Sequence, residues 1–360
     1  MTPDYADTNV TGVPVSCLAL SLYGNCSVKH YAAYAVGAAL VDTEIQVTDA
    51  ELSAMGVEKG MMTLVDQDRQ RELLAQLSDH LTSASHASGG SVCNSMIATA
   101  MMGAPTYMSC KVAQDADGDI YLADLEHSGV AHRLTDRSSD GVTGKCIVLI
   151  TPDAERSMNT HLGISETLST TEVDEAAIKN SAWVYLEGYL ATSPTGHAAA
   201  LKTKALAEQY GVHTAISFSD PGMVKFFRNN MAAMVEGGVE LVFCNESEAL
   251  EWGECDQLDD AVVTIKQVAK RFVITLGADG ALCWDGETLH RVAGHPVDAV
   301  NTNGAGDMFA GAFLYALSRG ETDLRATEFA TLAAGEVVKY CGPRLDRDIC
   351  LGLRRHFFGD

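Results

Sequence analysis

A glycine-rich turn followed by a carboxylate stands near the C-terminal end of the chain. Residues Asn301 to Phe309 read Asn-Thr-Asn-Gly-Ala-Gly-Asp-Met-Phe, and the apolar run that follows predicts a buried helix. The first N–H groups of a helix lack intrahelical partners, so phosphate oxygens could bind at Gly304, Ala305 and Gly306. Asp307 could accept a proton from an attacking hydroxyl. The pattern predicts phosphoryl transfer, although a plain glycine turn before a helix would look the same.

A second group of polar residues lies in the N-terminal third of the chain. In Ser88-Gly89-Gly90-Ser91-Val92-Cys93-Asn94 the glycine pair permits a close backbone approach, and the Asn94 amide can donate to and accept from a vicinal diol. Asp42 follows a short apolar run and could accept hydrogen bonds from hydroxyl groups of the same ligand. The alternative for Asp42 is a solvated carboxylate at the end of a strand.

Two further turns follow predicted strands in the C-terminal half. Mg²⁺ prefers carboxylate, amide and water oxygens, so Asn245 and Glu248 of Asn245-Glu246-Ser247-Glu248 could hold a hydrated ion against nucleotide phosphates. Acidic residues at a helix start also complement the helix dipole, which is the alternative. The second turn is Thr275-Leu276-Gly277-Ala278-Asp279-Gly280, which could accommodate a phosphate or form a plain β-turn.

Taken in their order along the chain, the motifs resemble those of the ribokinase-like (PfkB) carbohydrate and nucleoside kinases. The resemblance spans about residues 31–345, and Asn301 stands where the family signature begins with Asp. It implies an ATP-dependent kinase with Mg²⁺, in which Asp307 is the general base and Gly304 to Gly306 form the anion hole. The chain looks most similar to bacterial members called adenosine kinase, which implies a nucleoside acceptor. Ribose, fructose or a related sugar is the alternative acceptor.

The resemblance also assigns roles to individual residues. Asp42, Gly89, Gly90 and Asn94 would bind the acceptor, while Thr275, Gly277 and Gly280 would contact ATP together with Gly342. Arg156 would reach towards phosphate, and an exposed, solubilising arginine is the alternative. In the family, Asp at position 301 helps to build a monovalent-cation site, and the neutral Asn301 predicts weak or absent activation by potassium. The alternative is that Asn301 only caps the turn.

Two departures from the family pattern keep a different class of function open. Ala38 replaces a common Asn in the acceptor region, and Asn301 replaces the signature Asp. A catalytically weakened, nucleotide-binding regulator would fit these changes. The intact glycine run and Asp307 favour an enzyme, because loss of function would be expected to remove the base early.

Composition restricts the partners of the chain. Its 360 residues carry 25 Lys and Arg against 48 Asp and Glu, a net charge of −23, which argues against a polynucleotide partner. We expect no membrane partner, because no apolar stretch reaches the length of a membrane span. Ten cysteines without a Cys-x-x-Cys pair predict reduced thiols in a cytoplasmic protein.

Short apolar runs alternate with segments of helical spacing from about residue 30 onward. This alternation predicts an α/β fold, a doubly wound, mostly parallel sheet flanked by helices. The resemblance implies a kinase domain over 30–360 with a small β-sheet lid from about 38–65 and 131–150, which would exclude water and could form a homodimer contact. Residues 1–29 would be an N-terminal extension. Expected strands include 31–36, 106–112, 182–186, 213–218, 241–243 and 272–276, and expected helices 67–81, 91–102, 194–210 and 258–270.

Overall fold

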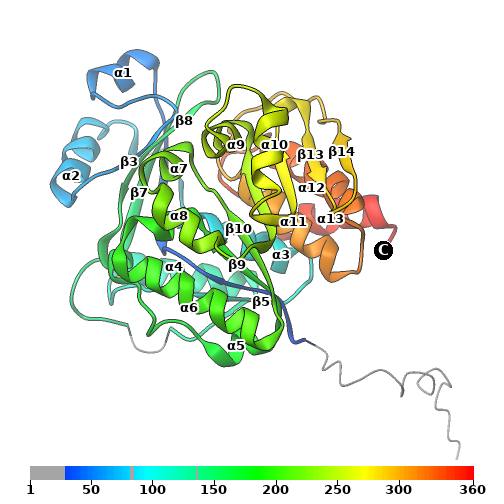
Figure 1. Ribbon diagram of the computed structural model, residues 1–360. Coiled ribbons are helices and arrows are strands. Elements are labelled where there is room, and N and C mark those ends of the chain that lie inside the picture. Colours follow the sequence, from blue (N-terminus) through cyan, green and yellow to red (C-terminus); the bar gives the residue numbers. More distant parts are fainter. Residues whose placement is uncertain (1–28, 82–84, 135–136) are drawn as a thin grey trace, which may run out of the picture.

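The centre of the fold is a nine-stranded sheet in the order β14-β13-β12-β11-β10-β9-β1-β5-β6 (Figure 1). The computed structural model describes residues 29–81, 85–134 and 137–360, so the expected extension 1–29 lies outside the described residues except for its last one. In this order the strands from β12 to β6 run parallel, and β13 and β14 continue the sheet antiparallel, which confirms the predicted mostly parallel sheet. The strands are β1 (Tyr31–Val36), β5 (Thr106–Ser109), β6 (Val130–His132), β9 (Ser181–Glu187), β10 (His213–Ser217), β11 (Val239–Asn245), β12 (Ala269–Thr275), β13 (Ala281–Trp284) and β14 (Leu289–Val292).

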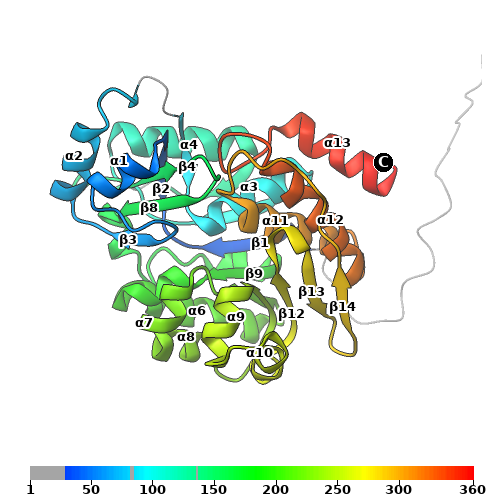
Figure 2. The same cartoon turned by 90° about the horizontal axis from the view of Figure 1, so that it is seen from above.

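Helices cover both faces of this sheet (Figure 2). Successive strand residues point to opposite faces, so Ala33 and Ala35 pack into one apolar core while Tyr34 and Val36 pack into the other. The first core contains α3 (Ser91–Met101), α4 (Ala116–Ser128), α11 (Ala305–Ser318), α12 (Asp323–Val337) and α13 (Arg347–Phe358). The second contains α5 (Glu175–Lys179), α6 (Pro194–Tyr210), α7 (Pro221–Phe226), α8 (Arg228–Val235), α9 (Glu246–Gly253) and α10 (Leu258–Ile265).

A second, five-stranded sheet has the order β3-β8-β7-β2-β4 and contains the expected lid segments, so we refer to it as the lid. Its strands are β2 (Leu40–Gln46), β3 (Met62–Leu64), β4 (Ser85–Gly89), β7 (Gly144–Ile150) and β8 (Arg156–His161). Helices α1 (Asp49–Ala54) and α2 (Gln67–Gln76) cover its outer face through an apolar cluster that includes Ile45, Leu52 and Leu73. The inner face carries Leu40, Cys146 and Met158, which line a cavity.

Several elements differ from the expectation. β6 belongs to the central sheet, because it pairs with β5, so the second lid segment begins only at β7. The lid also includes β8 and β4, the latter at the start of the expected acceptor loop. The expected helix over 258–270 ends at Ile265, because Ala269 already pairs with Val239 of β11 and tertiary pairing overrides the helical spacing.

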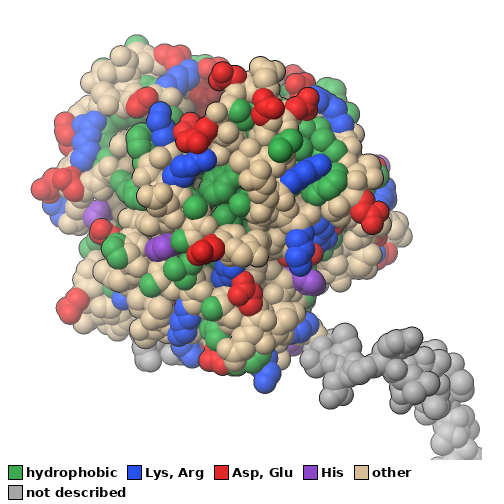
Figure 3. All heavy atoms as spheres, in the orientation of Figure 1, with side chains coloured by type: hydrophobic (Ala, Val, Ile, Leu, Met, Phe, Trp, Pro, Cys, Tyr) green, Lys and Arg blue, Asp and Glu red, His purple; other side chains and the backbone are tan. Residues whose placement is uncertain are grey.

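None of the helices in the described ranges has the length and hydropathy that a membrane span requires. On the face drawn in Figure 3, acidic and basic side chains intermix over the surface.

Candidate active site

A cavity of about 850 Å³ lies between the lid and the C-terminal ends of the central strands. Its wall includes Glu187 at the end of β9, Ser217 at the end of β10, Asn245 at the end of β11 and Thr275 at the end of β12. Ligands bind at this edge in open parallel sheets, because the loops that follow the strands converge there. The cavity therefore brings most of the predicted acceptor residues and most of the predicted nucleotide residues into one site.

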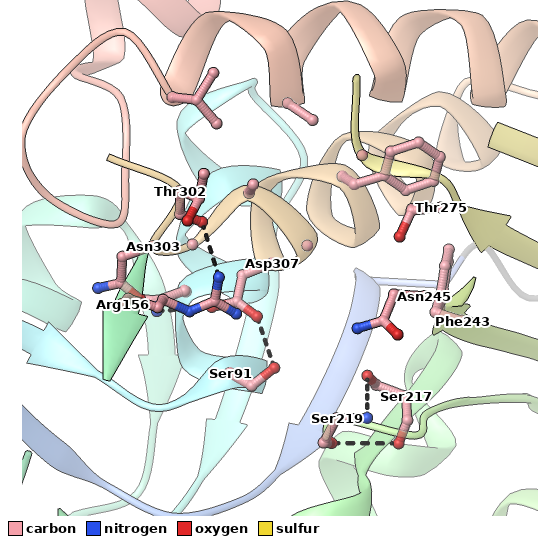
Figure 4. A pocket seen from close by; sticks show the side chains of 18 of the residues that line it. Ser91, Arg156, Ser217, Ser219, Phe243, Asn245, Thr275, Thr302, Asn303 and Asp307 are labelled. Carbon is pink, nitrogen blue, oxygen red and sulfur yellow. Dashed lines mark hydrogen bonds between the residues drawn. The ribbon is translucent and has the colours of Figure 1, made fainter. Parts of the chain in front are cut away.

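Asp307 lies in the first turn of α11 and faces this cavity (Figure 4). Ser91 Oγ donates to its Oδ1 at 2.6 Å, and Asn94 Nδ2 donates to its Oδ2 at 2.9 Å. Burial raises the pKa of the Asp307 carboxyl above its ordinary value, while these two hydrogen bonds and two arginine charges oppose the rise. The carboxylate is thus held in one orientation by helix α3, as a general base requires.

The turn before α11 leaves backbone donors open to the cavity. Gly304 has φ 75°, and a Cβ there would overlap the Pro343 carbonyl oxygen, so the turn requires glycine. Within the described ranges, no group accepts the N–H of Gly306 or Asp307, whereas Ala305 N donates to the Thr302 carbonyl at 3.3 Å. A Cβ on Gly306 would meet nothing within 4 Å. The open donors therefore overlap the predicted anion hole at Gly306, add Asp307 and leave out Ala305, whose N–H is engaged, and the binding of phosphate there stays a prediction.

Arg156 supplies positive charge to the same region. It begins β8, lines the cavity, and its Nη1 donates to the Thr302 carbonyl at 3.3 Å (Figure 4). No carboxylate in the described part of the chain forms an ion pair with it. A half-buried guanidinium facing the anion hole fits the predicted phosphate contact better than a solubilising role.

Of the predicted acceptor residues, Asp42, Gly90 and Asn94 line the lid end of the cavity, whereas Gly89 packs against Asp42 and does not line it. A Cβ on Gly89 would overlap the Asp42 carboxyl, and one on Gly90 would overlap the Ala38 carbonyl, so both glycines permit close packing. Burial, followed by the nearby charge of Glu44, raises the pKa of Asp42 to about 8. Asn94 Oδ1 is buried and has no hydrogen-bond partner among the described residues. A ligand hydroxyl that donates to Asn94 would satisfy this atom.

Glu187 is a site residue that the sequence motifs did not reveal. Its Oε1 accepts from Ala38 N at 2.7 Å and its Oε2 from Val92 N at 3.3 Å, so it joins the β1–β2 turn to the start of α3. Burial raises its pKa to about 7. The available signal was an acidic residue directly after the apolar run of the expected strand 182–186.

At the nucleotide end, Asn245 and Glu248 form a capping box for α9. Asn245 Oδ1 accepts from Glu248 N at 2.8 Å, and Glu248 Oε2 accepts from Asn245 N at 3.1 Å. Both residues also line the cavity, and burial raises the pKa of Glu248 to about 7. Asn245 Nδ2 also donates to Glu248 Oε1 at 2.7 Å, so the two side chains satisfy each other at the start of α9. Their predicted contact with a hydrated Mg²⁺ stays a prediction.

The second predicted nucleotide turn also reaches the cavity. Thr275, Gly277 and Gly280 line it, and Gly280 has φ 95° and packs so tightly that a Cβ would overlap the Val292 carbonyl oxygen. Gly342 does not line the cavity, although the neighbouring Pro343 packs against Gly304. Its predicted contact with ATP stays a prediction.

Asn301 is buried and acts as a turn cap in this structure. Its Oδ1 accepts from Asn303 N at 2.8 Å, and its Nδ2 donates to Glu44 Oε2 at 3.2 Å. Asn303 Nδ2 donates to Glu44 Oε1 at 2.7 Å. The Glu44 carboxylate on lid strand β2 therefore holds the loop before α11 through two side-chain amides, a link that no sequence motif predicted.

Comparison with known proteins places these features in context. The family model described as pfkB family carbohydrate kinase matches residues 59–350. The crystal structure of adenosine kinase from Sinorhizobium meliloti is 30% identical, with a TM-score of 0.86, and the match covers 91% of this chain and 99% of that chain. An adenosine kinase of Dictyostelium discoideum is 29% identical over 264 residues, 66% of this chain and 73% of that protein. A ribokinase of Staphylococcus aureus is 25% identical over 292 residues, 78% of this chain and 92% of that protein.

Proposed function

The chain belongs to the PfkB family of carbohydrate kinases, and from this premise we propose that it transfers the γ-phosphoryl group of ATP to a primary hydroxyl of a nucleoside. The observation that carries the proposal is Asp307, held by Ser91 and Asn94 beside the open N–H groups at the start of α11. A base next to an anion hole serves attack by a hydroxyl on a phosphoryl group.

In the proposed reaction the acceptor hydroxyl lies between Asp307 and the γ-phosphorus. Asp307 accepts the hydroxyl proton as the new O–P bond forms, and ADP leaves with the electrons of the broken bond. The N–H groups of Gly306 and Asp307 and the guanidinium of Arg156 face the charge that develops on the phosphoryl oxygens. The lid covers the acceptor end and limits access of water.

Asn245 and Glu248 would hold a hydrated Mg²⁺ against the phosphates. When bound, the ion neutralises charge on the phosphate oxygens. Thr275, Gly277 and Gly280 would contact ATP at the end of β12 and its following turn.

The lid favours a nucleoside over a free sugar. Asp42 and the unpartnered Oδ1 of Asn94 provide acceptors for ribose hydroxyls, which either substrate would satisfy. Beside them the lid presents an apolar wall that has no hydroxyl-binding use but suits the flat face of a base. Its members are Leu40, Met62, Leu64, Met158 and Leu162. Adenosine kinases among the relatives support the same choice, and the relatives named ribokinase keep a sugar as the second candidate.

A weakened regulator is less well supported. The Ala38 side chain lacks the amide of the family residue, but its backbone N–H is bound by Glu187, and the Asn301 turn is closed by Asn303.

We also propose a reduced, cytoplasmic location, because the described cysteines are free thiols. A homodimer through the lid stays a prediction.

An assay of ATP-dependent ADP release over adenosine, other nucleosides, ribose and fructose tests the proposal. Asp307→Asn should reduce kcat by about 10² to 10⁴-fold while ATP still binds, because removal of a general base has this effect. The exposed Asp259 of α10 provides a matched control, and Asp259→Asn should retain normal turnover. Near-normal turnover of Asp307→Asn would refute the assignment of the base.

A further inference from the structure

The segment between α12 and α13 contacts both the turn at Gly304 and the strand that carries Ser88. The Pro343 carbonyl packs against the Gly304 turn so closely that a Cβ on Gly304 would overlap its oxygen. The Nη1 of the next residue, Arg344, donates to Ser88 Oγ at 2.9 Å, and its Nη2 donates to Asp124 Oδ2 at 2.6 Å. Leu345 then enters the core at 2% exposure, which fixes the segment in place.

Ser88 connects Arg344 to the predicted acceptor residues. It is fully buried, its N–H donates to Asp124 Oδ2 at 3.1 Å, and its hydroxyl makes a short hydrogen bond to the same oxygen. The next residue, Gly89, lies directly against the Asp42 carboxyl. Ser88, Asp124 and Arg344 thus form a closed, charge-assisted network that fixes the position of Gly89 and with it the space left for Asp42.

The guanidinium also adds positive charge beneath the site without entering the cavity. It opposes the rise in the pKa of both Asp42 and Asp307 that burial causes, and it holds the pKa of Asp124 below its ordinary value against the effect of burial. The other charged or titratable groups around Asp42 and Asp307 are Glu44 of β2, Cys146 of β7, Arg156 of β8, Tyr185 and Glu187 of β9, and Tyr189. Arg156 and Arg344 are the cations of this group.

We propose that Arg344 is a positioning residue that holds the Ser88–Gly90 loop in register with the Gly304 turn, so that Asp42 and Asp307 face one acceptor molecule. The proposal rests on the function proposed above. Arg344 does not line the cavity, so it would act through Ser88, through Asp124 and through its charge. Its loss should therefore affect the acceptor far more than ATP.

Kinetics of the full-length enzyme with adenosine test this role. Arg344→Met should raise the acceptor KM about tenfold or more, because charge-assisted hydrogen bonds to a buried loop are lost, and leave the KM for ATP within about twofold. The acidic limb of kcat/KM should move to higher pH, since removal of a cation raises the pKa of both carboxyls. Arg344→Lys keeps the positive charge but loses the planar guanidinium that donates to Ser88 and Asp124 together. The acceptor KM should therefore rise, while the acidic limb of kcat/KM stays near that of the wild type.

The control is Arg347→Met, an exposed arginine three residues further along, which should match the wild type in every parameter. If Arg344→Met does not fold, Arg344→Lys decides alone. An equal rise of both KM values, or an unchanged acceptor KM, in an active protein would overturn the inference and leave the proposed function intact. A wild-type enzyme without phosphoryl transfer to any acceptor would overturn the proposed function and the inference with it.

Discussion

Replacing Asn301 by aspartate should place two carboxylates together in a buried site. The Nδ2 of Asn301 lies 3.2 Å from Glu44 Oε2, and both residues are buried. At that separation two negative charges repel by about 5 kcal/mol with an effective dielectric constant of about 20. Uptake of a proton limits the cost, because protonating a carboxyl of pKa about 4 at about pH 7 requires about 4 kcal/mol.

We therefore expect Asn301→Asp to lower the free energy of unfolding by about 2–4 kcal/mol at pH 7, part of which comes from lost hydrogen bonds. The deficit should shrink as the pH falls, because the carboxyl pair binds a proton more readily in the folded state. Urea unfolding from pH 5 to pH 8 measures both effects. Glu44→Gln removes one of the two charges, so the double variant Asn301→Asp/Glu44→Gln should recover much of the stability.

Potassium provides a second measurement on the same pair. A cation bound between the two carboxylates would relieve their repulsion, so potassium at fixed ionic strength should stabilise Asn301→Asp more than an equal concentration of tetramethylammonium. The wild type, with a neutral amide at this position, should show little potassium activation in initial rates. A variant as stable as the wild type at pH 7, with no dependence on pH or potassium, would refute this account of Glu44 and Asn301.

The remaining predictions concern the acceptor carboxyl, the anion hole and the lid. Because the pKa of Asp42 is raised from 3.8 to about 8, the folded protein keeps a proton that the unfolded chain releases, so stability should fall as the pH rises between these values. Asp42→Asn should flatten that decline in urea unfolding, and an unchanged slope would contradict the raised pKa. Gly304→Ala should destabilise the fold by about 1–3 kcal/mol through strain at positive φ, whereas Gly306→Ala should fold normally and lose activity, a contrast that unfolding and kcat measurements would reveal. Saturating substrate should slow hydrogen exchange in β2, β7 and β8 more than in the distal helix α10, and uniform protection would argue against lid closure.

The parts of the site that the sequence predicts are those whose residues lie close together along the chain. Asp307 and the Gly304 turn are adjacent in the chain, and Asn245 with Glu248 spans one helical turn, so spacing alone brings these groups together. Glu44 and Asn301 are 257 residues apart, and their contact depends on how the lid folds over the central sheet. No spacing rule in the sequence reports such a contact.

The same limit applies to the sheets. Strand β7 is apolar enough to be predicted from the sequence. Strand β8 carries the polar residues Arg156, Asn159 and His161, and it joins the lid only because β7 and β3 pair with it. The short strand β6 has too little sequence pattern to reveal its sheet, and its pairing with β5 decides the matter.

The two sides of the lid differ in how firmly hydrogen bonds hold them to the rest of the protein. On one side, β2 is held by Glu44 to the loop before α11, and β4 is held through Ser88 to Asp124. On the other side, the edge strand β3 ends at the exposed Leu64, and within the described ranges β8 is its neighbour in the sheet. Separation of β3 from β8 disturbs none of the bonds made by Glu44 or Ser88, and it leaves the contacts of Arg156 and Ala154 with Thr302 in place. We therefore expect solvent exchange and acceptor entry to begin at this apolar margin, beside Met62 and Leu64, while the carboxyl group of Asp42 remains in place.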